Sequence, residues 1–144
     1  MKRFGLAVMM CLTLAAALGY LRDPPWLATQ SSGLRNWETG TDGTEFRWAG
    51  AHASLFVPAN ARDVRIPLRT TFDTTGDWPV TVSIAIDDQP VDRLVLSDAG
   101  WRESRIRLPP PGSRRVRRVD IRSDRTRDDN RAVQVGHITF GNVN

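Results

Sequence analysis

From residue 44 towards the C-terminus, apolar and polar residues alternate with a period of two. Successive side chains of a strand point to opposite faces of a sheet, whereas the apolar face of a helix repeats roughly every 3.6 residues. The pattern therefore predicts β-strands that each bury one face. It is clearest from Val80 to Ile86, where Val80, Val82, Ile84 and Ile86 alternate with small or polar residues.

About eight such runs occur, with turn signals roughly every 8–12 residues, which is typical of an antiparallel sandwich or barrel. They cover residues 46–48, 53–57, 64–68, 80–86, 91–96, 106–108, 119–121 and 133–135 or 138–140. The predicted class is all-β, a jelly-roll-like antiparallel β-sandwich preceded by one apolar helix. Pro67 falls inside a run, which predicts an edge strand or a bulge there, because proline cannot donate to a ladder.

The N-terminal segment follows the pattern of a signal peptide. Lys2 and Arg3 precede an apolar run up to Leu18, and Gly19 supplies a cleavage position. Residues 4–21 are also long enough for a membrane anchor, so both fates remain open. We expect residues 1–19 to be a signal peptide or anchor, 20–33 a linker and 34–144 the sandwich. The basic N-terminus predicts export to the periplasm or another extracytoplasmic location.

The composition excludes several kinds of site. Cys11, the only cysteine, lies in the leader, so the exported domain has neither a disulfide nor a cysteine metal site. The chain has 144 residues, a length that leaves room for one domain, and its net charge is +4. Arginine supplies nearly all the basic residues with few aromatic residues between them, so we expect no nucleic-acid partner. We expect no cofactor.

The sequence contains no motif for an activated nucleophile, and we predict a non-catalytic protein. His52 and Ser54 share one face of a predicted strand, which allows a contact between them. A solvent-facing pair is the more ordinary interpretation. No pair of carboxylates is marked as an acid and a base by its surroundings in the sequence.

Two acidic pairs allow two interpretations. Asp87–Asp88 and Asp128–Asp129–Asn130 are rich in oxygen ligands and could hold calcium. Aspartate and asparagine also favour turns, because their side chains bond to the nearby backbone. Neither pair has the spacing of an EF-hand, so we favour turns and predict no metal site.

Residues 114–131 are unusually rich in arginine, with partly compensating aspartates. Forked guanidinium contacts could bind the phosphate of an envelope glycan, or the surface could dock an acidic partner. The more ordinary interpretation is a solvated strand face with paired charges. The arginines are Arg114, Arg115, Arg117, Arg118, Arg122, Arg125, Arg127 and Arg131.

The tryptophans are the other candidate contacts. Trp48 alternates in phase with Phe46, which predicts a core position. Trp37, Trp78 and Trp101 lie near predicted turns or strand starts. Their rings could stack on the apolar face of a sugar, or they could simply pack in the core.

Several segments occur in an order that resembles a known group of domains. They are Gly33-Leu34-Arg35-Asn36-Trp37, Phe46-Arg47-Trp48, Ile86-Asp87-Asp88, Gly100-Trp101, Val119-Asp120-Ile121 and Asp128-Asp129-Asn130-Arg131. The order is similar to that of small non-catalytic β-sandwich domains of bacterial envelope proteins, which look like carbohydrate-binding modules and occur beside multi-spanning glycosyltransferases. The resemblance implies binding without catalysis.

Our sequence-based hypothesis is a non-catalytic, envelope-facing module that binds glycan or an envelope partner. Its predicted ligand contacts are Trp78, Trp101, Asp128, Asp129 and Arg131. Envelope polysaccharide or a membrane glycosyltransferase is the expected partner, and residues 4–21 could anchor the chain. The alternative is a structural domain that docks an acidic partner through its arginines and binds no glycan.

Overall fold

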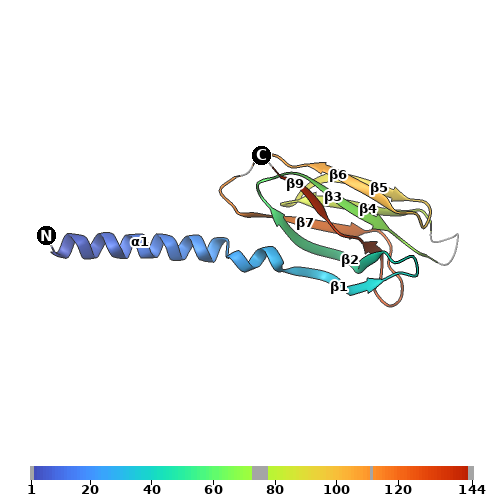
Figure 1. Cartoon of the computed structure of the whole chain (residues 1–144), viewed down its shortest axis with the longest axis horizontal. Helices are drawn as coiled ribbons and strands as arrows, with labels where there is room; N and C mark the ends of the chain where they lie inside the picture. Colours follow the sequence, from blue (N-terminus) through green and yellow to red (C-terminus); the bar gives the residue numbers. More distant parts are fainter. Residues whose placement is uncertain (1, 73–77, 111, 143–144) are drawn as a thin grey trace.

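The structure, a computed structural model, describes residues 2–72, 78–110 and 112–142. Helix α1 (Lys2–Arg22) projects away from a β-domain and joins it through the 3-10 turn η1 (Pro25–Thr29), as Figure 1 shows. In the described part of the chain, this is the one helix whose length and composition would allow it to cross a membrane. An apolar N-terminal helix fits the expected signal peptide or anchor.

The described residues form nine strands, which confirms the all-β class. They are β1 (Ser31–Thr39), β2 (Glu45–Pro58), β3 (Ala61–Arg69), β4 (Val80–Ile86), β5 (Gln89–Leu96), β6 (Arg102–Arg107), β7 (Val116–Ser123), β8 (Val133–Val135) and β9 (Thr139–Asn142). All pairings are antiparallel. The predicted runs correspond to β2 through β9, and the two alternatives for the last run are both strands.

Strand β2 belongs to both layers of the sandwich. Its residues 47–49 pair with β8, and its residues 52–58 pair with β7. The full path is β5-β4-β7-β2-β8-β3-β6, with β1 added to β2 and β9 to β3. The two ends of this path approach each other, because the Ser104 hydroxyl on β6 donates to Asp92 on β5. The sheet therefore curls into a jelly-roll-like sandwich.

The core lies between the two layers. It contains the alternating residues of the central strands, such as Val82 and Ile84 on β4, Ile66 on β3 and Ile121 on β7, all at most 1% exposed. Burial of such side chains is the main force that holds two sheet layers together. The partner residues in each strand, including Ser83 and Arg122, point to the outer face.

Strand β1 was not predicted, and residues 31–33 of the expected linker belong to it. Eight of its nine residues are exposed and the strand carries two register shifts, so no apolar alternation marks it. Gly33 has a φ of 71° and approaches the carbonyl of His52, which makes a bulge that only glycine adopts easily. Residues 1, 143 and 144 of the expected segments lie outside the described residues.

The expectation of an edge strand at Pro67 was wrong, because β3 is paired on both sides. The alternative, a bulge, fits better: residues 66–67 of β3 face residues 136–138, two residues against three. Pro67 lies opposite Glu103 of β6, and its carbonyl accepts from Gly136 at 3.0 Å. Its nitrogen therefore faces the break between β8 and β9, where no strand needs a proton from it. A central strand tolerates proline at such a break.

The turns alternate between two ends of the sandwich. We call the end near α1 the proximal end. It is made by the β2–β3 and β4–β5 turns and by residues 108–110 and 112–115 (Figure 1), and Asp23 at the end of α1 accepts from the backbone of Arg115. The opposite, distal end contains the β1–β2, β5–β6 and β7–β8 loops.

Candidate functional site

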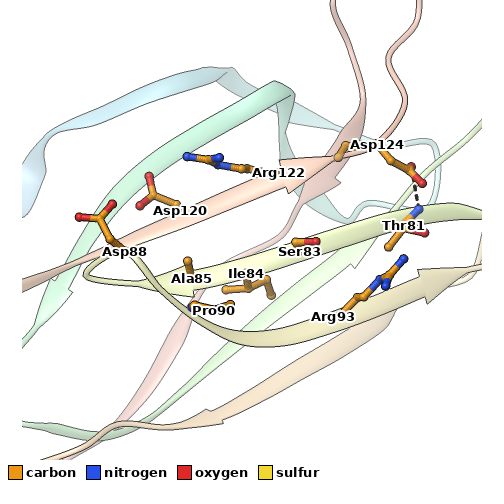
Figure 2. A pocket seen from close by; sticks show the side chains of 11 residues that line it. Thr81, Ser83, Ile84, Ala85, Asp88, Pro90, Arg93, Asp120, Arg122 and Asp124 are labelled. Atoms are coloured by element: carbon orange, nitrogen blue, oxygen red, sulfur yellow. Dashed lines mark hydrogen bonds between the residues drawn. The ribbon is translucent and has the colours of Figure 1, made fainter.

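A depression of about 480 Å³ lies in the outer face of β4, β5 and β7. Ser83 and Ala85, two small residues of β4, form its floor. Each pairs across to β7, Ser83 with Arg122 and Ala85 with Asp120. Figure 2 shows Arg122 and Arg93 on opposite sides of Ser83. Short side chains between long ones thus create the hollow.

Asp120 lies at one edge of the depression and is almost fully buried, with a side chain only 3% exposed. Ser54 donates to its Oδ1 at 2.6 Å, His52 Nε2 lies 3.0 Å from the same oxygen, and Arg118 Nε donates to Oδ2 at 2.9 Å. Burial by itself raises the pKa of Asp120, but these hydrogen bonds outweigh it and hold the pKa below its usual value. Asp120 is therefore ionised at neutral pH.

Ser54, His52 and Asp120 do not form a catalytic triad. In a triad the histidine bridges the other two residues through its two different ring nitrogens. Here Nε2 of His52 faces both Asp120, at 3.0 Å, and the Ser54 hydroxyl, at 3.3 Å. The Ser54 hydroxyl donates its proton to Asp120 at 2.6 Å, so His52 does not accept that proton as the base of a triad would. The His52–Ser54 contact allowed by the sequence exists, but it orders the sheet face instead of activating a nucleophile.

The rim combines fixed acceptors with available donors. Asp124 accepts from the backbone N–H of Thr81 at 2.8 Å, and Asp88 forms an ion pair with Arg118. Among the described residues, the guanidinium groups of Arg93 and Arg122 have no side-chain partner. Carboxylate acceptors and guanidinium donors around a small-residue floor can bind vicinal hydroxyl groups, which each offer one donor and two acceptors.

Sequence reasoning missed this site. Its central residue, Asp120, lies between Val119 and Ile121 in a clearly alternating strand. Aspartate is uncommon within strands, which was an available signal. The register that brings it beside Ser54 and Ala85 was not available from one sequence.

The structure places the predicted tryptophans away from the depression. Trp78 is half-buried, packs against the core and meets Phe72 edge to face, with ring centroids 6.4 Å apart. Trp101 is also half-buried, with the guanidinium of Arg69 4.6 Å from its ring centroid. Trp37 is 47% exposed, and its ring stacks on His137 at 4.2 Å.

The predicted loop residues lie at the distal end. Asp129 pairs with Arg131, and this hydrogen bond holds the pKa of the Asp129 carboxyl below its usual value despite some desolvation. Asp128 is exposed in the same turn. The guanidinium of Arg131 lies 5.1 Å from the ring centroid of Trp48. Trp48 is buried as expected, but on the opposite face of β2 from the main core.

Ring contacts connect two of the predicted residues, Arg131 and Trp101. Arg131 covers Trp48, Trp48 meets Phe46 at 6.0 Å, and the guanidinium of Arg69 contacts the rings of both Phe46 and Trp101. Trp78 packs against the core instead. The structure therefore brings Arg131 and Trp101 into one row of contacting side chains, Arg131, Trp48, Phe46, Arg69 and Trp101, which we call the distal layer. Trp78 lies outside it.

Both acidic pairs lie in turns, as favoured. Asp87 and Asp88 have φ values of 48° and 67° and form the two-residue turn between β4 and β5. Among the described residues, no three of the histidine, cysteine, aspartate and glutamate side chains form a group that could hold a metal ion.

No protein-family model matches the sequence, and no curated protein matches it. The fold is similar to that of a family two carbohydrate esterase from Cellvibrio japonicus, with TM-score 0.51 and 16% identity over 81% of this chain and 32% of that chain. A family two carbohydrate esterase from Clostridium thermocellum, in complex with cellohexaose, gives 0.50 and 11% over 78% and 31%.

A third similar structure contains the M60 catalytic domain with the CBM51-1 and CBM51-2 domains of ZmpB from Clostridium perfringens. It gives TM-score 0.51 and 10% identity over 81% of this chain and 14% of that chain. The chain spans a third or less of each of these three proteins. At these identities the likeness concerns the fold alone. The class defined here is a jelly-roll-like antiparallel β-sandwich, shared with proteins that act on or bind carbohydrate.

Proposed function

We propose that this chain is a non-catalytic glycan-binding module that α1 holds at the outer surface of a cytoplasmic membrane. The observation that carries the proposal is the polar depression over Ser83 and Ala85. The similar folds of carbohydrate esterases and of CBM51-containing chains support it as an analogy of architecture. Envelope polysaccharide is the proposed ligand, and a membrane glycosyltransferase is the proposed source of that ligand.

The depression suits neutral or weakly charged sugars. Arg93 and Arg122 offer forked donors, while Asp88 and Asp124 offer acceptors on the same rim. Each net hydrogen bond is worth about 0.5–1.5 kcal/mol, so several are needed for measurable binding. The residues that line the hollow include no aromatic ring. Recognition therefore depends on hydroxyl groups, and we expect weak binding that increases with chain length.

The absence of catalysis is part of the proposal. The strongest apparent constellation, Ser54–His52–Asp120, has the wrong hydrogen-bond pattern to deprotonate the serine. A second candidate surface consists of the contacts predicted from the sequence: Trp78, Trp101, Asp128, Asp129 and Arg131. Trp78 packs against the core, whereas Trp101 and Arg131 belong to the distal layer.

Affinity electrophoresis tests the proposal with the full chain in detergent and a panel of soluble polysaccharides. We expect retardation by at least one polysaccharide. The Arg93→Gln/Arg122→Gln variant should weaken that binding tenfold or more. The matched control is Arg102→Gln/Arg105→Gln, which removes the same charge from exposed positions on β6.

Equal binding by both double variants would contradict the depression as the site. In that case Trp101→Ala and Trp37→Ala would test the aromatic surfaces. Loss of binding in Trp101→Ala alone would return the site to the distal layer, as the sequence predicted.

A further inference from the structure

Exposed arginines gather at the proximal end, close to the point where α1 ends. Leu108 donates to the carbonyl of Arg62 at 3.0 Å, and Ala59 donates to the carbonyl of Arg115 at 2.8 Å, so these segments lie side by side. Among the described residues, five exposed arginines of this end have no side-chain partner: Arg22, Arg62, Arg107, Arg114 and Arg115.

The carboxylates of the proximal end form no ion pair with these five arginines, because each of them bonds to another group. Asp23 is 7% exposed and accepts from the backbone N–H of Arg115. Asp87 accepts from the backbone of Arg118 at 2.9 Å, and Asp88 pairs with the Arg118 guanidinium. None of these three carboxylates pairs with the five arginines, and the arginines outnumber the carboxylates, so the proximal end carries surplus positive charge.

The adjacent outer face of β3 and β6 extends the same surface. Arg65 and Arg105 lie directly opposite each other on the two strands, where like charges destabilise a sheet. Their carboxylate neighbours are Asp63, 3.9 Å from Arg65, and Glu103, 2.5 Å from Arg105. A hollow of about 280 Å³ opens between Arg62, Arg65, Arg105 and Arg107, and Asp63 also lines it, so four guanidinium groups face one carboxylate. An external anion placed there would relieve the repulsion.

The position of the surface relative to α1 identifies the partner. Asp23 directly follows the helix and is fixed to Arg115, so the arginines lie at the level where an inserted α1 would leave the bilayer (Figure 1). Lipid phosphates lie at that level. Guanidinium groups bind phosphate through two parallel hydrogen bonds, and attraction to an anionic surface acts within a Debye length, about 10 Å at ordinary salt.

We propose that the proximal end docks on anionic lipid headgroups, with its five unpaired arginines facing lipid phosphates. The sandwich then stands on the membrane with the distal loops pointing away from it. This inference rests on one part of the proposed function, the retention of α1 in the bilayer, and is independent of glycan binding.

The test uses the full chain reconstituted in vesicles, in a Cys11→Ser background. One fluorophore is attached at Asn60→Cys in the proximal β2–β3 turn, and a second preparation carries it at Thr41→Cys in the distal β1–β2 turn. A lipid with a spin-labelled headgroup serves as quencher. We expect quenching at position 60 to be stronger in vesicles that contain phosphatidylglycerol than in pure phosphatidylcholine, with little quenching at position 41.

Each arginine near an anionic surface contributes about fivefold to binding, which corresponds to about 1 kcal/mol. The Arg62→Gln/Arg114→Gln variant should therefore lower the docking constant roughly 30-fold. The matched variant Arg102→Gln/Arg125→Gln, which changes exposed residues towards the distal end, should leave it unchanged. High salt should abolish the difference between the two kinds of vesicle.

Equal quenching at position 60 in neutral and anionic vesicles would overturn the inference, as would normal docking of the Arg62→Gln/Arg114→Gln variant. Deacylated lipopolysaccharide is the soluble competitor. If it binds through these arginines while lipid composition has no effect, the surface recognises an acidic polysaccharide and the lipid assignment fails. Loss of glycan binding in Arg93→Gln/Arg122→Gln has no bearing on this result, so the two proposals fail separately.

Discussion

At the scale of single residues, Asp120 shows how a buried charge is accommodated on the outer face of a sheet. A carboxylate removed from water destabilises a fold unless its oxygens are bonded. Ser54, His52 and Arg118 supply those bonds from two neighbouring strands. The same bonds orient the side chains at one edge of the depression, so stability and binding geometry depend on the same group.

We expect Asp120→Asn to lower the free energy of unfolding at neutral pH by about 1–3 kcal/mol, because charged hydrogen bonds are weakened and Arg118 loses one of its two carboxylate partners. Urea unfolding of the two proteins measures this. Since the pKa of Asp120 is lowered in the folded state, its stabilisation is fully present above the ordinary carboxyl range. It is lost as the pH falls through the lowered pKa, below about pH 4.

The difference in stability between the two proteins should therefore shrink on acidification. A difference that stays constant down to acid unfolding would show that Asp120 acts through packing and not through its charge. Ser123→Ala on the same strand is a suitable control, because its hydroxyl bonds only the neighbouring loop.

Trp37 gives a second prediction at this scale. Its ring is 47% exposed, whereas that of Trp48 is 4% exposed. Trp37→Phe should remove part of the red-shifted emission that acrylamide quenches and leave the part from Trp26, which is 54% exposed. Trp48→Phe should remove blue-shifted emission instead. The opposite assignment would contradict the placement of β1 on the sheet edge.

At the scale of elements, the strands in which apolar and polar residues alternate were predictable from the sequence. β1, which has no such alternation, was not predicted. β4 was predictable from the sequence, because it buries every second side chain in the core. β7 shows the same alternation only at Val119 and Ile121, which belong to that core. β1 buries none of its side chains fully, so its sequence resembles a linker. Its strand character comes from pairing with β2, which a local pattern does not report.

The bulge in β1 is testable. A Cβ atom on Gly33 would approach the carbonyl oxygen of His52 to 2.1 Å, and the φ of 71° disfavours any other residue. Gly33→Ala should destabilise the domain by about 1–3 kcal/mol, measured by thermal unfolding. Gly43→Ala, in a turn with φ of 78° and open space around it, separates backbone strain from collision. If both variants lose the same stability, the close approach to His52 has no role.

At the scale of the whole molecule, the class was predictable while the site was not. Period-two alternation and frequent turns suffice to indicate a curled antiparallel sandwich. The depression needs Ser83, Asp120 and Arg93, from three strands, to lie in adjacent rows, and that depends on long-range register. Trp101 and Arg131 were predicted as ligand contacts from their residue types. Their ring contacts are with Arg69 and Trp48, and nothing in the sequence marked those two residues as their neighbours.

The fate of α1 is a prediction at this scale. We expect the full chain, 16.1 kDa, to remain in the membrane fraction after an alkaline wash. Leu12→Arg should release part of it, because arginine at the centre of a spanning helix costs about 2.5–3.5 kcal/mol. A soluble product shortened at Gly19, found by mass spectrometry, would identify the segment as a cleaved signal peptide and remove the basis for membrane docking.

Because β2 runs without a break through both layers, neither layer can detach while the other stays intact. Force applied to the layer that contains β4, β5 and β7 is transmitted along one covalent strand, β2, into the opposite layer. The domain should therefore unfold cooperatively under tension. The amide protons of β4 and β3 should exchange with solvent only when the whole domain unfolds. If the proposed tether and ligand are both present, the mechanical limit is the rupture of the whole sandwich and not the loss of one sheet.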